Sequence, residues 1–233
     1  MDISAVELGS SGQSSVSLEM DIGAMEGLKK MPVDMFDGVY LGKAFKNALI
    51  LCVDIRNFSE FFHSEAEASV FKLIKEFTSN LLSCINQVAY GCSYYKLMGD
   101  GALVIWDETN LASINEALEI FDTYTEFLND ELFKSYDTLG MGGALVMGKV
   151  FKYEISAEVS QLKYRDYVGY GINLACRLQG MAGINQLILN DRLAISGAIP
   201  FKIDQSEKII KELHILKGLM EEDRQHVLIY DKN

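Results

Sequence analysis

The feature that most constrains this chain is an apolar strand that ends in an acid. Six consecutive apolar residues, Ala48 to Val53, are followed directly by Asp54. A short, unbroken apolar run predicts a strand that is buried on both faces. An ionised carboxylate is rarely kept at such a place without a partner or a metal ion. The sequence therefore predicts a buried strand with a functional acid at its end.

The order of the other elements indicates the fold class. Helical spacing runs from about 66 to 88 and from about 112 to 133, and two strand-like runs, 93–98 and 102–106, lie between these helices. Two further strands, 139–147 and 149–155, are expected around Gly148, followed by a helix over 169–181 and short strands at 186–189, 209–215 and 225–230. This order predicts an α+β fold with a ferredoxin-like split βαβ core and C-terminal additions.

Length and composition suggest one domain with an arm. A chain of 233 residues, about half of them apolar, can bury one sizeable core. Residues 9–15 are almost all glycine and serine and cannot bury enough apolar surface to become ordered. We expect residues 1–40 to form a flexible or partly ordered arm and residues 41–233 to form the folded domain.

Charge and cysteine usage exclude several classes of function. The formal net charge of -12 argues against a nucleic-acid or anionic-membrane surface, because both need clustered positive potential. The first thirty residues lack a basic start and an unbroken apolar run, so neither a signal peptide nor a membrane span is expected. The four cysteines lie far apart and show no zinc-ligand spacing with the histidines. A reduced, cytoplasmic protein is the simplest interpretation.

A second acid is expected close to the first. Asp100 lies between Gly99 and Gly101 in the predicted hairpin, which neighbours the first strand in a split βαβ sheet. Two facing aspartates repel each other unless a cation lies between them, and hard oxygen ligands favour Mg²⁺ or Mn²⁺. Taken alone, Asp100 also fits an ordinary Asp-Gly turn, and Asp54 fits an acid at a strand end.

Two further segments carry candidate phosphate ligands. The stretch from Ile55 to Ser59 leads into a helix, where free backbone N–H groups could hold phosphates, with Ser59 as a plausible N-cap. Farther along, Asn173 and Arg177 lie four residues apart on one helical face. An amide and a guanidinium there could bind a phosphoryl group as its charge redistributes, although a solvated surface helix explains them too.

Three motifs in register resemble those of class III adenylate and guanylate cyclases. They are Val53-Asp54-Ile55-Arg56-Asn57-Phe58-Ser59, then Lys96-Leu97-Met98-Gly99-Asp100, then Asp166-x-x-Gly169-x-x-x-Asn173-x-x-x-Arg177, and the resemblance covers roughly residues 45–231.

The resemblance implies a role for each matching residue, with residues 41–233 as the catalytic domain. It implies that Asp54, Asp100 and the backbone carbonyl of Ile55 bind two Mn²⁺ or Mg²⁺ ions, and that Asn173 and Arg177 stabilise the transition state. It further implies a homodimer in which the metal aspartates of one protomer face Asp166, Asn173 and Arg177 of the other. The expected phosphate-binding residues are Arg56, Asn57, Phe58, Ser59 and Lys217, although Lys217 also fits an exposed surface lysine.

The base is harder to predict. Lys96 and Asp166 match the pair that reads adenine in adenylate cyclases, which favours ATP. Tyr167 beside Asp166 would leave less room for a purine, and Arg165 could donate a hydrogen bond to a pyrimidine carbonyl, although the tyrosines in this region could instead pack in the dimer interface.

The arrangement of the chain, a cyclase-like domain with only a short arm, looks like that of the Pycsar cyclases of bacterial antiphage defence. Those enzymes make cyclic UMP or cyclic CMP for a separate effector protein. We therefore predict a pyrimidine cyclase that prefers UTP. An adenylate cyclase is the first alternative, and a catalytically inactive nucleotide-binding module is the second.

Overall fold

The computed structural model describes residues 38–157, 162–195, 217–224 and 227–232. The chain divides into two compact units, and the smaller one contributes only residues 38–39, 155–157 and 162–164 to the described part. The larger unit holds every candidate site residue. The expected arm, residues 1–40, and the expected strand at 209–215 lie almost wholly or wholly outside the described residues.

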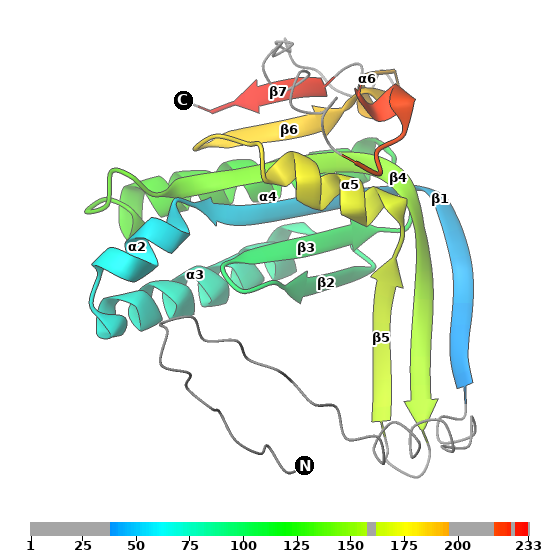
Figure 1. Ribbon diagram of the computed structural model, residues 1–233, viewed down its shortest axis with the longest axis horizontal. Helices are drawn as coiled ribbons and strands as arrows, with labels where there is room; N and C mark the ends of the chain where they lie inside the picture. The colour runs from blue at the N-terminus through cyan, green and yellow to red at the C-terminus, as the bar shows by residue number, and fades with distance from the viewer. Residues whose placement is uncertain (1–37, 158–161, 196–216, 225–226, 233) are drawn as a thin grey trace, which may run out of the picture. The chain divides into compact units, whose positions relative to one another are not determined.

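Strands and helices are interspersed along the described part of the chain (Figure 1). In order they are β1 (Gly38–Arg56), α2 (Phe58–Ser64), α3 (Glu67–Val88), β2 (Tyr94–Leu97), β3 (Gly101–Trp106), α4 (Leu111–Phe127), a π-helical turn (Leu128–Leu132), β4 (Gly140–Ala157), β5 (Leu162–Val168), α5 (Tyr170–Gln179), β6 (Gln186–Asn190), α6 (Asp191–Ile195), a 3₁₀ turn (Glu221–Arg224) and β7 (Val227–Asp231).

The described strands form one sheet in the order β2-β3-β1-β4-β6-β7, with β5 paired to β4. β3 is antiparallel to both β1 and β2, β6 is parallel to β4, and β7 is antiparallel to β6. The first four strands with α3 and α4 make the split βαβ core, and α5, β6 and β7 are the C-terminal additions. The predicted α+β fold class is therefore confirmed.

The middle of β1 alternates between two buried faces. Leu49, Leu51 and Val53 belong to the core that α3 and α4 cover. Ile50 and Cys52 belong to a second core, on the side of α5. The prediction of a strand buried on both faces is confirmed, since Ala48 to Val53 are at most 1% exposed. By the same alternation, Asp54 follows Cys52 onto the α5 side of the sheet.

Glycines let α5 lie directly on β4. A Cβ atom on Gly148 would come within 2.7 Å of the Cα atom of Gly171, and one on Gly169 within 2.6 Å of the carbonyl oxygen of Lys149. Gly169 also has a φ of 152°, which L side chains rarely adopt. These contacts fix the distance between the helix and the sheet.

Two predictions about the strands were wrong or incomplete. Residues 139–147 and 149–155 are not two strands separated at Gly148, because β4 runs without interruption through that residue. That glycine marks the close approach of α5. β5 was missed because Leu162–Val168 is rich in charged residues and lacks apolar alternation.

The start of α2 also differs from the prediction. The helix begins at Phe58, so Ser59 lies in its first turn and is not the N-cap. Asn57 takes the N-cap position with a φ of 62°, a left-handed conformation that asparagine tolerates better than most residues. The left-handed residue turns the chain sharply between β1 and α2.

The contact between α5 and β4 can be tested by filling it. Gly148→Ala should lower the free energy of unfolding by about 1–3 kcal/mol, because the added methyl group overpacks the crossing. Urea titration followed by circular dichroism measures the change. Gly180→Ala is the matched control, because its Cβ would find its nearest neighbour at 3.4 Å and its φ is -61°. Equal destabilisation by both variants would contradict this account of the crossing.

Candidate active site

The structure brings Asp54 and Asp100 together at the junction of β1 and the β2–β3 hairpin. The strand register pairs Asp54 with Gly101, and the Ile55 amide donates a hydrogen bond to the Asp100 carbonyl oxygen at 3.2 Å. A Cβ atom on Gly101 would lie 2.4 Å from the Val53 carbonyl oxygen and 3.0 Å from Asp54 Oδ1. Only glycine therefore allows this approach.

The two carboxylates affect each other. Burial raises the pKa of Asp100 above its usual value, and the negative charge of Asp54 raises it further. The ionised form of Asp100 is thus disfavoured where it stands. A divalent cation between the two acids would remove this penalty, as expected for a cation site.

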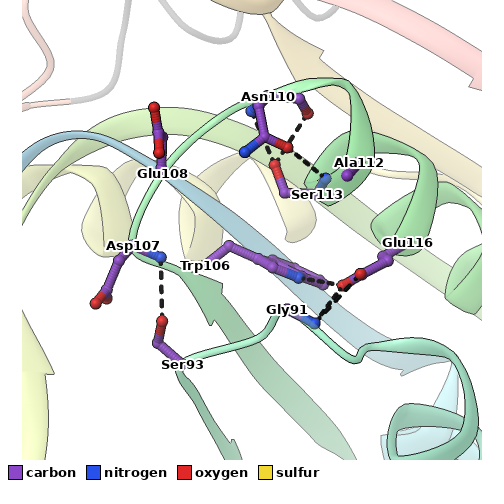
Figure 2. A pocket seen from close by; sticks show the side chains of 9 residues that line it. All are labelled: Gly91, Ser93, Trp106, Asp107, Glu108, Asn110, Ala112, Ser113 and Glu116. Carbon is purple, nitrogen blue, oxygen red and sulfur yellow. Dashed lines mark hydrogen bonds between the residues drawn. The ribbon is translucent and has the colours of Figure 1, made fainter.

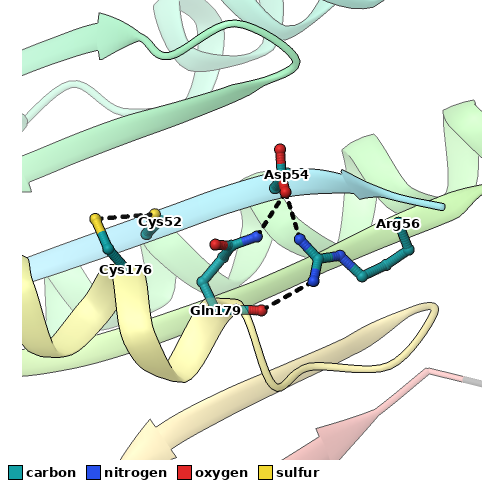
Figure 3. A network of polar contacts seen from close by, with 5 residues as sticks. All are labelled: Cys52, Asp54, Arg56, Cys176 and Gln179. Carbon is teal, nitrogen blue, oxygen red and sulfur yellow. Dashed lines mark hydrogen bonds and ion pairs between the residues drawn. The ribbon is translucent and has the colours of Figure 1, made fainter. Parts of the chain in front are cut away.

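Arg56 and Gln179 hold the Asp54 carboxylate from the α5 side (Figure 3). Arg56 Nη2 and Gln179 Nε2 both donate hydrogen bonds to Asp54 Oδ2, the second at 2.9 Å. Arg56 Nη1 also donates to the Gln179 carbonyl oxygen at 3.2 Å. The Arg56 side chain lies close over Gly142, where a Cβ atom would approach its Cδ to 2.7 Å. Arg56, predicted to contact phosphate, is therefore engaged with Asp54.

Gln179 is a site residue that sequence reasoning missed. It is the last residue of α5 and is buried, with 9% of its surface exposed. A buried amide at the end of a helix needs partners for its polar atoms, and here Asp54 is one of them. A glutamine two residues beyond Arg177 carries no spacing signal of its own, so only the fold reveals its contact with the strand end.

The donor set fits a hard divalent cation. No group of three or more histidine, cysteine, aspartate or glutamate side chains gathers anywhere in the described ranges. The acidic ligands at this junction are the Asp54 and Asp100 carboxylates, and a contribution from the Ile55 carbonyl stays a prediction. Mg²⁺ is commonly held by one or two carboxylates together with substrate phosphates and water. Two carboxylates at one strand junction match that pattern.

The other predicted phosphate-binding residues surround the turn into α2. The Asn57 amide donates to the Thr138 carbonyl oxygen at 2.7 Å, which anchors the left-handed turn. Phe58 is half-buried and packs its ring against Phe61, with centroids 6.1 Å apart. Ser59 is exposed in the first turn of the helix. Their contact with phosphate stays a prediction.

Lys96 on β2 and Asp166 on β5, the predicted base-reading pair, form an ion pair. Lys96 Nζ lies 2.7 Å from Asp166 Oδ2, although the residues are 70 positions apart. Asp166 is only 5% exposed, and its Oδ1 accepts a hydrogen bond from the Tyr167 amide at 2.8 Å. The pair presents a donor and an acceptor side by side.

The side chains of Tyr167 and Arg165 have other partners than Lys96 and Asp166. The Tyr167 ring is 3% exposed and packs in the core, 5.2 Å from Tyr94 between ring centroids. Its hydroxyl donates to Asp107 at 2.8 Å. Arg165 is exposed and forms an ion pair with Glu154 at 2.7 Å. Tyr167 therefore packs in the core, and a contact of Tyr167 or Arg165 with a base stays a prediction.

Asn173 and Arg177 lie on α5, as the spacing predicts. Asn173 is exposed, and Arg177 Nη1 donates to the backbone carbonyl of Lys217, whose side chain is exposed. Within the residues that the structure describes, no hydrogen bond joins either residue to Asp54 or Asp100. Among the described residues of one chain, the two halves of the predicted site are therefore not joined by a hydrogen bond.

A separate cavity of about 240 Å³ lies beside the start of α4 (Figure 2). Trp106 Nε1 donates to Glu116 there at 2.7 Å, and Asp107 and Glu108 add further acids. No lysine or arginine lines this cavity, and none of the predicted site residues does. The acidic side chains that line the cavity would repel a triphosphate.

Comparison with solved structures identifies the fold. The adenylyl cyclase CyaB from P. aeruginosa aligns with a TM-score of 0.64 at 15% identity, covering 83% of this chain and 94% of its own. The guanylyl cyclase Cya2 gives 0.59 at 18% identity, with 82% and 93% covered. The described chain has the fold of a class III nucleotidyl cyclase catalytic domain.

A further similar structure is the catalytic core of a rhodopsin-guanylyl cyclase with converted specificity, in complex with ATPαS. It aligns with a TM-score of 0.60 at 12% identity, covering 82% of this chain and 97% of its own. No sequence-family model matches the chain, and no curated protein sequence does. Among the described residues, no helix is long and apolar enough to cross a membrane.

The repulsion between the two aspartates predicts a stability effect. Because folding raises the pKa of Asp100, stability falls as pH rises through the window between the unfolded and the folded pKa, and the penalty remains at higher pH. Asp100→Asn should therefore raise the melting temperature at pH 7 in chelator.

Added Mn²⁺ should raise the melting temperature of the wild type more than that of Asp100→Asn, so that the wild type becomes the more stable of the two. Scanning calorimetry measures both effects. Glu131→Gln, which removes one exposed negative charge from the turn after α4, is the control for net charge. A lower melting temperature for Asp100→Asn in chelator would contradict the proposed repulsion.

Proposed function

We propose that this protein converts a nucleoside triphosphate into a 3′,5′-cyclic monophosphate and pyrophosphate. The observation that carries the proposal is the convergence of Asp54 and Asp100 at one strand junction, held there by the close approach of Gly101. The fold of a class III nucleotidyl cyclase catalytic domain supports the same reaction.

The reaction needs groups that hold the triphosphate and stabilise charge at the α-phosphorus. Two divalent cations bound by Asp54 and Asp100 would lower the pKa of the ribose 3′-hydroxyl and neutralise the leaving pyrophosphate. The turn from Arg56 to Ser59 binds phosphate oxygens through backbone N–H groups. The 3′-oxygen attacks the α-phosphorus in line, and the bond to pyrophosphate breaks. Asn173 and Arg177 stabilise the charge that builds on the α-phosphoryl oxygens.

We propose that each active site is shared by two chains. Asn173 is exposed on α5, and neither it nor Arg177 is hydrogen-bonded to Asp54 or Asp100 in the described chain. The chain carries both sets of residues, so a symmetric homodimer would contain two complete sites.

We propose that the base is a pyrimidine, with UTP preferred over CTP. Lys96 supplies a donor and Asp166 an acceptor at 2.7 Å from each other, which suits the adjacent O4 acceptor and N3–H donor of uracil. Tyr94, two residues before Lys96 on the same face of β2, packs against Tyr167 and limits the space available to a larger base.

Adenine is the alternative base. Its N1 acceptor and N6 donor also match the Lys96–Asp166 pair, which corresponds to the adenine-reading pair of adenylate cyclases. We propose that the cyclic product acts as a second messenger for a separate effector in antiphage defence.

Substrate choice is tested by incubating purified protein with Mn²⁺ and each of ATP, GTP, CTP and UTP, and identifying products by mass. The proposal expects cyclic UMP as the main product and cyclic CMP as the next. Cyclic AMP alone would establish the adenylate cyclase instead. The absence of a cyclic product from all four would favour an inactive nucleotide-binding module.

Shared sites are tested by mixing two inactive variants. Asp54→Ala and Arg177→Ala should each lose about three orders of magnitude in turnover. Co-refolded at equal amounts, they should regain roughly a quarter of wild-type turnover, because half of random dimers are mixed and each holds one intact site. The control mixture of Asp54→Ala with Asp100→Ala should stay inactive. Failure of the first mixture to recover would contradict shared sites.

A further inference from the structure

Two cysteines meet between β1 and α5, next to the candidate site (Figure 3). Cys52 Sγ and Cys176 Sγ lie 3.9 Å apart, although 124 positions separate them in the sequence. Both thiols are free. Cys52 comes two residues before Asp54 on the same face of β1, and Cys176 directly precedes Arg177 on α5. Neither thiol has a role in the proposed reaction.

The two thiols differ in reactivity. Cys176 is half-buried, whereas Cys52 is 1% exposed. A hydrogen bond from Cys52 lowers the pKa of the Cys176 thiol to about 7, with burial opposing it and the positive charge of Lys96 assisting. The lowered pKa favours the thiolate of Cys176, which is the form that reacts with oxidants. Cys52 lies beside Cys176 and is the second thiol of the pair.

We propose that Cys52 and Cys176 form a reversible disulfide when the protein meets hydrogen peroxide, and that this bond stops turnover. The pair is thus an oxidative modification site that links the strand of the metal aspartate to the helix of Asn173 and Arg177. The effect on turnover rests on the proposed function, whereas formation of the disulfide does not.

The chemistry proceeds in two balanced steps. Cys176 Sγ attacks one peroxide oxygen, the O–O bond breaks, and the departing hydroxide takes a proton to leave as water, so that Cys176 becomes a sulfenic acid. Cys52 Sγ then attacks Cys176 Sγ and the S–O bond breaks. The leaving hydroxide takes the Cys52 proton and departs as a second water. The two sulfurs together lose two electrons, which reduce one peroxide to two waters.

Closing the bond brings the two sulfurs together across the contact between β1 and α5. A disulfide holds its sulfurs about 2.05 Å apart, so the present separation must shrink by about 2 Å. The Gly148–Gly171 contact leaves α5 no space to move closer to β4 as a whole. Backbone movement that accompanies closure is therefore a tilt or rotation of the helix, which displaces Asn173 and Arg177. A misplacement of 1 Å in a catalytic group can cost about 10²-fold in rate.

Formation of the bond is measured on the full chain by intact mass after treatment with one equivalent of hydrogen peroxide. The expected result is a loss of about 2 Da that dithiothreitol restores, with a peptide map joining Cys52 to Cys176. Cys84→Ala and Cys92→Ala should behave as the wild type, whereas Cys176→Ala and Cys52→Ala should not lose this mass. A bridge that involves Cys84 or Cys92, or stable oxygen addition at Cys176 with Cys52 free, would overturn the proposal.

The effect on turnover is measured with the triphosphate that the reduced protein cyclises. The oxidised wild type should lose at least about tenfold in turnover and recover it with dithiothreitol, while Cys176→Ala should keep its turnover in peroxide. Unchanged turnover in a fully bridged protein would overturn the inhibitory role. If the reduced wild type cyclises no triphosphate, the proposed function fails, and the mass result alone decides whether the disulfide exists.

Discussion

The close approach of the β2–β3 hairpin to the end of β1 is the contact on which the candidate site depends. Asp54 lies opposite Gly101, and the Cβ atom of any other residue there would lie 2.4 Å from the Val53 carbonyl oxygen. The approach forces two carboxylates together in a half-buried place, where burial and mutual repulsion raise the pKa of Asp100. A site that is electrostatically unfavourable without a cation is well suited to binding one.

Helix α5 connects this junction with the residues proposed to act on the α-phosphate. Its last residue, Gln179, holds Asp54, while Asn173 and Arg177 lie earlier on the same helix. In a dimer with shared sites, one helix would contact the metal aspartate of its own chain and serve the transition state in the other site. The position of α5 on β4 therefore bears on both sites, and the cysteine pair lies where a covalent bond would change that position.

The sequence predicted the fold class and the meeting of Asp54 with Asp100, because apolar runs and element order determine the topology of a split βαβ sheet. It missed β5, because the charged residues of that strand interrupt the apolar alternation that would predict it. It divided β4 at Gly148, where the glycine instead allows the close contact with α5. Gln179 and the core position of Tyr167 depend on long-range packing, which local patterns do not encode.

The proposed two-metal site at Asp54 and Asp100 is tested by electron paramagnetic resonance of the protein loaded with Mn²⁺ and a non-cyclisable triphosphate analogue. We expect two spin-coupled ions per active site, about 3.5–4 Å apart, and loss of the coupled signal in Asp100→Asn. Uncoupled Mn²⁺ in the wild type, or a coupled pair that survives in Asp100→Asn, would contradict it.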